Sequence, residues 1–312
     1  MTVARTLSIA RVVTLAAALT FALALRVRAQ GADSYPARCG VAGVSVDRGG
    51  YLPLPRGEVF CPLIADPKAT RSFAAYQRGN ETDLATNIVA VGIADQFPFF
   101  RAYASRPGNG VQLGLAGAVF AQFDAGTPSY DLLNADYIIG LPLTFRSGRF
   151  SGRARLYHQS SHLGDEFLLR PNPPQRDNLS FESTELLLSI DVAALRVYGG
   201  GETFVRRDPA NLPDHLLHTG AELRPRALLN VGTIATIRLV AATDVKVVSD
   251  TAVRTAVSAR LGFEFARPRD YELGSRRWSL LAEYYDGPSP YGQFQFHQQQ
   301  VRLTGIGFHF TL

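Results

Sequence analysis

The stretch Thr251 to Ala266, TAVRTAVSARLGFEFA, alternates apolar and polar side chains along most of its length. Leu261 and Phe263 fall on one face, and Arg260 and Glu264 fall on the other. This period of two residues is that of a β-strand, in which neighbouring side chains point to opposite faces. The run is far longer than the roughly six residues of an average strand. A long strand with one continuous apolar face is typical of a barrel whose outer wall contacts lipid.

Comparable runs continue through most of the chain after residue 110. We therefore predict an all-β fold, a closed antiparallel transmembrane β-barrel of about 12 strands. The connections tend to alternate between short and long, as expected when one end of a barrel faces the periplasm and the other the exterior. The expected strands are 87–94, 97–104, 111–123, 133–146, 150–162, 178–191, 194–206, 214–224, 230–247, 251–266, 275–286 and 299–311.

The N-terminus has the features of a secretory signal peptide. Two arginines precede an apolar run, 12–25, that is too short to span a bilayer. Small or modest side chains at 27–29 predict cleavage before Gln30. An N-terminal membrane anchor is the alternative, which is disfavoured because Arg26 and Arg28 end the apolar run early. No later run is apolar enough for a transmembrane helix.

Composition limits the partners of the chain. Of its 312 residues, 46% are hydrophobic and 19% are charged, which excludes a disordered chain. The net charge is +5, but four of the basic residues lie in the first 29 positions, where there is no acid. The remainder is almost neutral and has no basic stripe with interleaved aromatic residues, so we expect no binding of nucleic acid. The expected partners are outer-membrane lipids, because the apolar wall must contact them.

We predict three parts along the chain: a signal peptide, 1–29, a small periplasmic N-terminal segment, 30–85, and the barrel, 86–312. The two cysteines, Cys39 and Cys61, both lie in the N-terminal segment. An exported chain folds in an oxidising compartment, so we expect a structural Cys39–Cys61 disulfide.

Three stretches carry a resemblance to a known family. They are FCPLIADPKATR at 60–71, VFAQFDAGTPSYDLLNADYIIGLPL at 119–143 and LYHQSSHLGDEFLL at 156–169. These stretches resemble the uncharacterised bacterial family called domain of unknown function 1207, and the resemblance covers about residues 55–312. That family has no established activity, so the resemblance adds to the prediction of fold and location but implies no mechanism.

The candidate site lies in the stretch 157–162, YHQSSH. His158 and Ser160 are two residues apart on one strand, so they share a face at a spacing of roughly 6.5 Å. An imidazole can reach a hydroxyl at that spacing, as activation of a nucleophile requires. Arg153 and Arg155 occupy the opposite face and must point into the lumen. His158 and Ser160 are therefore expected on the outer wall, near the extracellular rim.

The next strand offers an acid for the same face. In the expected strand 178–191, the apolar residues at 186, 188 and 190 lie on the outer face. Glu182 and Asn178 are an even number of residues away, so they are expected on the same face. Ser160 would attack an ester carbonyl, His158 would accept its proton, and Glu182 would orient the imidazole. A register shifted by two pairs would bring Asn178 in place of Glu182, and His162 is the other alternative member. This predicts a lipid-ester hydrolase that faces the membrane and acts on phospholipid or lipid A acyl chains.

The arrangement resembles outer-membrane phospholipase A and the lipid A deacylases. Those barrels carry a His-x-Ser pair on one strand within a His-x-Ser-Asn-Gly or His-x-Ser-Asn-Ala-Gly motif, with an Asn or Glu partner on the following strand. His158 and Ser160 match this pattern. Ser161 stands where the motif has Asn and His162 where it has Gly, so the oxyanion hole of those enzymes is not carried over.

Two other interpretations stay open. One is a non-enzymatic outer-membrane barrel, either a structural protein or a narrow pore. The other is a metal site, but His158 and His162 lie about 13 Å apart on a straight strand, too far to share an ion. Asp165 and Glu166 could contact a bound Ca²⁺ ion in the following loop. We expect no other cofactor.

Overall fold

The structure, a computed structural model, describes residues 50–79, 86–103, 108–171, 176, 178–225, 227–249, 254–268, 276–295 and 300–311. Within these ranges, no helix is long and apolar enough to cross a membrane. The elements are β1 (Gly50–Pro53), β2 (Ser72–Gly79), β3 (Asn87–Tyr103), β4 (Gly110–Asp124), β5 (Leu132–Ser147), β6 (Phe150–Leu163), α2 (Asp165–Leu168), β7 (Leu179–Val192), β8 (Leu195–Asp208), β9 (His215–Leu223), β10 (Leu229–Val231), β11 (Ala235–Ser249), β12 (Arg254–Ala266), β13 (Arg277–Pro288), α4 (Gly292–Gln295) and β14 (Gln300–Thr311).

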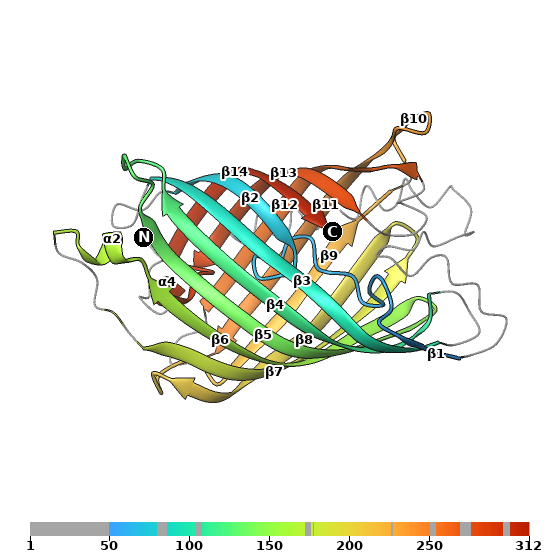
Figure 1. Ribbon diagram of the computed structural model, residues 1–312, viewed down its shortest axis with the longest axis horizontal. Coiled ribbons are helices and arrows are strands. Elements are labelled where there is room, and N and C mark those ends of the chain that lie inside the picture. Colours follow the sequence, from blue (N-terminus) through green and yellow to red (C-terminus); the bar gives the residue numbers. More distant parts are fainter. Residues whose placement is uncertain are drawn as a thin grey trace, which may run out of the picture.

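The long strands close into a ring (Figure 1). Each strand from β3 to β9 pairs with the next, and β11 to β14 continue the series through a β9–β11 pair. β14 pairs with β2 and β2 with β3, which completes the circle. All these pairs are antiparallel, while the short β1 and β10 pair with β3 and β11. The predicted closed antiparallel barrel of 12 strands is confirmed.

The two faces of the strands separate as their sequence predicts. On β12, Arg260 and Glu264 are buried in the lumen, whereas Leu261 and Phe263 are exposed on the outer wall. The same division holds on β5, β6 and β7. The wall therefore presents an apolar surface to its surroundings and encloses a polar interior, as a barrel in lipid requires.

The first two strands differ from the prediction. The runs 87–94 and 97–104 form one strand, β3, in which a β-bulge between Pro98 and Phe100 shifts the register. A bulge reverses the faces of every residue beyond it, so the alternation breaks within the strand. The first barrel strand is instead β2, which starts at Ser72 inside the segment expected to be periplasmic. The barrel thus begins at residue 72 and not at residue 86.

Residues 54–71, here called the lumen plug, run inside the ring between β1 and β2 (Figure 1). Lumen-facing arginines of the wall hold its main chain: Arg101 donates to the Gly57 carbonyl at 2.6 Å, and Arg196 to the Cys61 carbonyl at 3.0 Å. Arg260 likewise donates to the carbonyl of Ile64. Residues 59–71 of the expected periplasmic segment therefore pack within the barrel, because a 12-stranded wall encloses more space than its own side chains fill.

Apolar and charged side chains of the plug complete the packing. Phe60 is 1% exposed and lies between the guanidinium groups of Arg153 and Arg196, whose central carbons are 5.2 and 4.4 Å from its ring centre. Lys68 forms an ion pair with Asp136 of β5. The plug is thus fixed to the wall both by its main chain and by its side chains.

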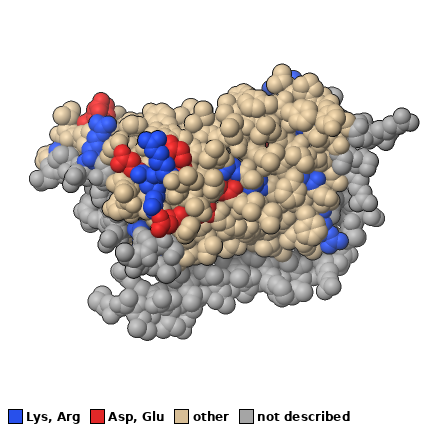
Figure 2. Space-filling view, turned by 90° about the horizontal axis from the view of Figure 1, so that it is seen from below, with Lys and Arg blue, Asp and Glu red and all other residues tan. Residues whose placement is uncertain are grey.

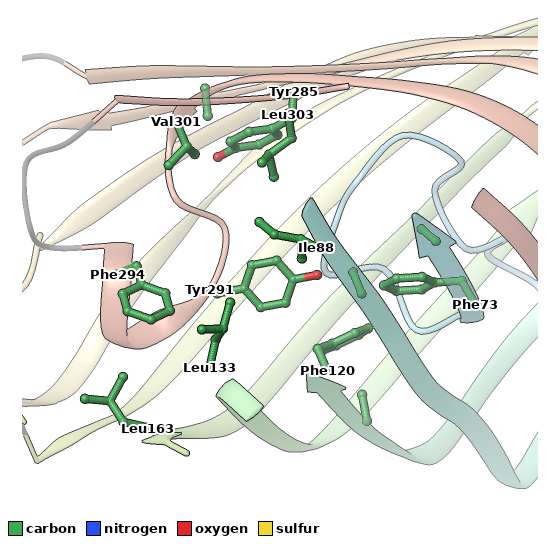
Figure 3. Packing of buried hydrophobic residues seen from close by; sticks show 14 of the residues in the cluster. Phe73, Ile88, Phe120, Leu133, Leu163, Tyr285, Tyr291, Phe294, Val301 and Leu303 are labelled. Atoms are coloured by element: carbon green, nitrogen blue, oxygen red, sulfur yellow. The ribbon is translucent and has the colours of Figure 1, made fainter. Parts of the chain in front are cut away.

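A second segment closes the end of the barrel that carries α2 and α4. Tyr291 and Phe294 point into the lumen, where they join Leu133 and Leu163 of the wall (Figure 3). The Gly292 amide of α4 donates to Asp136 at 3.1 Å. The plug and the α4 segment thus both pack inside the ring, and a cavity lined by Pro67, Tyr285 and Tyr291 lies between them.

Two expectations about the N-terminus fall partly outside the described residues. Cys61 is buried in the lumen plug, but Cys39 lies outside them, so the Cys39–Cys61 disulfide stays a prediction. The expected signal peptide, 1–29, also lies outside the described residues.

Candidate functional site on the outer wall

The pairing of β6 with β7 places His158 directly opposite Glu182. His158 Nδ1 lies 2.9 Å from Glu182 Oε1, within hydrogen-bonding distance. The two side chains are 41% and 33% exposed. The structure therefore brings together the histidine and the acid that the sequence placed on one face, in the register that favours Glu182.

This pair lies on the outer wall. Leu156 and Leu186, which share its face, are exposed, while Arg153 and Gln159 of the opposite face are buried in the lumen. Tyr137 of β5 is exposed on the same wall, opposite Ser160. Aromatic residues mark the border between the apolar band and the polar headgroups in such barrels. The pair thus lies at the edge of the apolar band, toward the end that carries α2.

Ser160 follows His158 on the same face and is half-buried, with Ser180 as its opposite residue on β7. Among the residues that the structure describes, none is hydrogen-bonded to its side chain, His158 included. The contact with Glu182 uses Nδ1 of His158 and leaves Nε2 for a second partner. In Ser-His-acid sites the acid binds Nδ1 and the nucleophile is activated by Nε2.

Asn178 and His162, the alternative members of the predicted catalytic site, contact other residues. The amide of Asn178 donates to Asp208 Oδ2 at 2.6 Å. The ring of His162 packs edge-on against Tyr137, with ring centres 5.8 Å apart. Neither residue contacts His158 through any bond described for it, so Glu182 is the partner that the register selects.

The weak metal candidates Asp165 and Glu166 are exposed in the first turn of α2. Neither belongs to a group of three metal-ligating side chains within the described part of the chain. The Ca²⁺ contact suggested for this loop therefore gains no further ligand from the described residues.

A family model described as "protein of unknown function (DUF1207)" matches residues 37–312. The chain belongs to this family. No curated protein matches the sequence.

Solved structures similar to this member of the family are outer-membrane barrels. The outer membrane phospholipase dimer of Salmonella typhi with bound calcium is 12% identical, with a TM-score of 0.50 over 77% of this chain and 89% of that chain. Outer membrane phospholipase A from Escherichia coli is 13% identical, with a TM-score of 0.49 over 77% and 89% of the two chains. The β domain of the Bordetella autotransporter BrkA is 12% identical, with a TM-score of 0.43 over 78% and 97%.

Identities this low bear on the fold alone. Together with the closed ring and its apolar outer surface, this likeness of fold places the protein in the bacterial outer membrane.

Sequence reasoning missed one neighbour of the pair. Arg206 Nε lies 3.9 Å from Glu182 Oε2, and the Arg206 side chain is 82% exposed. Strict alternation from Phe204, which is buried, would turn Arg206 into the lumen. A bulge at Val205 shifts the register of β8 against β7 and turns Arg206 outward. No local signal in the sequence marks this bulge.

The outer wall is unevenly charged. Figure 2 shows the largest group of acidic and basic side chains near the left end of the barrel, the end that carries α2 and α4 in Figure 1. Beside this group, most of the visible wall is neither acidic nor basic. His158 and Glu182 lie on β6 and β7. Because α2 follows β6 directly, both strands reach the end of the barrel where this charged group lies.

Proposed function

We propose that this outer-membrane barrel is a lipid-ester hydrolase, with Ser160 as the nucleophile, His158 as the general base and Glu182 as the group that orients the imidazole. The observation that carries the proposal is the 2.9 Å contact between His158 Nδ1 and Glu182 Oε1 on the outer wall. This contact fixes one ring nitrogen and directs the other away from the acid, as a base beside a hydroxyl requires.

The chemistry follows from the two side chains on β6. With the imidazole held by Glu182, rotation of the Ser160 side chain toward His158 on their shared face would bring Oγ toward Nε2, because their Cα atoms are roughly 6.5–7 Å apart. Oγ attacks the ester carbonyl carbon as its proton passes to Nε2. The imidazolium returns that proton to the leaving alcohol, and water then releases the fatty acid by the same path.

The position of the site supports a lipid substrate. Leu156 and Leu186 supply apolar surface on one side of the pair, against which acyl chains can lie. Arg206 lies beside Glu182, in the same row of paired residues as His158, where its exposed guanidinium can contact a headgroup phosphate. These contacts support phospholipid or lipid A acyl esters as the substrate class.

The oxyanion must be stabilised by groups other than the side chain of Ser161. That side chain points into the lumen, where it donates to Asn134 at 3.0 Å and to Asp136. Arg206 is exposed close to the pair and is the cation best placed to approach a developing negative charge. We therefore expect loss of Arg206 to lower the catalytic rate as well as substrate binding.

The test is acyl release from vesicles of phospholipid and from lipopolysaccharide by the purified, folded full-length protein. Ser160→Ala should lower the rate by on the order of 10⁶-fold. Ser180→Ala is the matched control, because Ser180 is the residue opposite Ser160 on the same face. Retention of the heat-resistant band on gels shows that each variant is folded.

Equal acyl release by Ser160→Ala and the native protein would refute the proposal and leave the non-enzymatic barrel. The lumen plug and the α4 segment occupy part of the interior of the described structure. The non-enzymatic outcome would be that of a structural barrel or a narrow pore.

A further inference from the structure

Three side chains that can bind a metal meet inside the barrel, away from the outer-wall pair. Asp66 comes from the lumen plug, His218 from β9 and Asp244 from β11. One ligand atom from each lies within 4.8 Å of the others, and all three residues are buried. The barrel thus assembles two carboxylates and one imidazole from segments far apart in the sequence.

Each of the three side chains also has a partner within the lumen. Lys246 Nζ lies 2.7 Å from Asp66 Oδ1 and balances one carboxylate. The second carboxylate, that of Asp244, accepts from the Tyr198 hydroxyl at 2.6 Å and contacts His218 Nε2 at 2.6 Å. The two carboxylates and the imidazole therefore face one another in a polar part of the lumen.

We propose that Asp66, His218 and Asp244 bind a divalent transition metal ion, with Zn²⁺ as the probe. Carboxylate oxygens and an imidazole nitrogen are ordinary ligands for such an ion. Bonds of about 2.1 Å put tetrahedral ligand atoms about 3.4 Å apart, so modest side-chain rotations close the present spacing. The ion would coordinate Nε2 of His218, so the neutral imidazole would take the form that carries its proton on Nδ1.

Lys246 competes with the ion in this arrangement. Its ammonium group occupies the position beside Asp66 that the metal needs, so binding of the metal displaces it toward other acids of the lumen. Because the ligands come from the plug and from two adjacent wall strands, the metal would tie the plug to the wall. Binding should therefore also stabilise the docked plug.

The experiment titrates EDTA-treated, folded full-length protein in detergent with Zn²⁺. Bound metal is counted by mass spectrometry after dialysis, and Co²⁺ is used to record the visible absorption of a tetrahedral site. We expect one ion per chain, and His218→Gln and Asp66→Asn should each weaken binding by about 100-fold or more. His162→Gln, which removes an exposed histidine of the outer wall, should leave the affinity unchanged.

Lys246→Met separates a metal site from a purely structural ion pair. Removal of the competing ammonium should tighten Zn²⁺ binding by about tenfold or more. Weaker binding in a folded Lys246→Met protein, no ion retained by the native protein, or equal affinity of native protein and His218→Gln would overturn the proposal. Acyl release by Ser160 does not enter these measurements, so the two proposals can fail separately.

Discussion

Replacement of Phe60 by Ala should release the lumen plug while the barrel stays closed. Phe60 is 1% exposed and packs with Leu63 of the plug and with Leu187 and Tyr198 of the wall. Its ring also lies against the guanidinium groups of Arg153 and Arg196. No other side chain of the plug combines this burial with two cation–π contacts among those described.

The size of the effect follows from these contacts. Truncation of a buried Phe to Ala costs about 3–5 kcal/mol, which includes the cavity left behind. Each cation–π contact contributes about 2 kcal/mol at a desolvated site such as this one, partly within that range. We therefore expect the docking free energy of the plug to fall by about 3–5 kcal/mol, which is at least roughly 10²- to 10³-fold in its opening equilibrium.

Hydrogen–deuterium exchange followed by mass spectrometry measures this opening. Amides of 54–71 should exchange roughly 10²- to 10³-fold faster in Phe60→Ala, while amides of β5 to β7 keep their rates, because local opening sets each rate separately. Leu54→Ala is the control, since Leu54 belongs to the same segment but is 77% exposed. Unchanged exchange in the plug would refute the anchoring role of Phe60. Equal acceleration over the whole barrel would show that plug and wall open as one unit.

Three further predictions concern the plug and the wall. Burial raises the pKa of Glu58 from 4.5 to about 8. The contribution of protonated Glu58 to plug docking is therefore fully present below pH 4.5 and is lost as the pH rises through 8. In Glu58→Gln, hydrogen-exchange rates of the plug, corrected for the intrinsic effect of pH, should lose this dependence. Gly200→Ala places a Cβ 1.9 Å from a main-chain oxygen of β7 and should reduce the folded, heat-resistant fraction, whereas Gly199→Ala, whose Cβ meets its nearest atom at 3.6 Å, should not. Mass spectrometry without reductant should find the peptides of Cys39 and Cys61 linked, and separate peptides would contradict the predicted disulfide.

The wall and the outer pair could be predicted because strand parity is a local property. Near the middle of β6 and β7, polar lumen residues such as Arg153 and Glu185 alternate with outward leucines such as Leu156 and Leu186, so the parity of these residues places His158 and Glu182 on the outer face. Their direct opposition depends on the register of the β6–β7 pair, which the sequence left open between Glu182 and Asn178. The structure resolves that choice through the pairing of the whole strand.

The same reasoning fails at β-bulges and in strands that have apolar residues on both faces. In β3 the bulge at Pro98 divides one strand into two apparent ones, and in β8 the bulge at Val205 turns Arg206 outward. β2 has aromatic residues on both faces: Phe73 points into the lumen and Tyr76 points outward. Phe73 can be apolar because it packs against Phe120 in the lumen. A strand that packs against apolar residues on both faces does not alternate between apolar and polar residues, so its sequence lacks the period of two that predicts a strand.

The plug could not be predicted, because its partners are far away in sequence. Its apolar residues, such as Phe60 and Ile64, suggest a small packed segment but not where it packs. The carbonyl oxygens that Arg196 and Arg260 bind are common to every residue and leave no trace in the sequence. Only the closed ring brings these groups together.

The most direct test of the proposed hydrolase is labelling of the folded protein with a serine-directed fluorophosphonate, followed by mass spectrometry of the peptide that contains Ser160. An activated hydroxyl attacks phosphorus and loses its proton to the base, so the reaction reports Ser160 and His158 together. The proposal predicts an adduct on Ser160 in the native protein, no adduct on Ser180, and a labelling rate reduced by about 10²-fold or more in His158→Gln. An unlabelled Ser160, or labelling that persists at the native rate in His158→Gln, would contradict it.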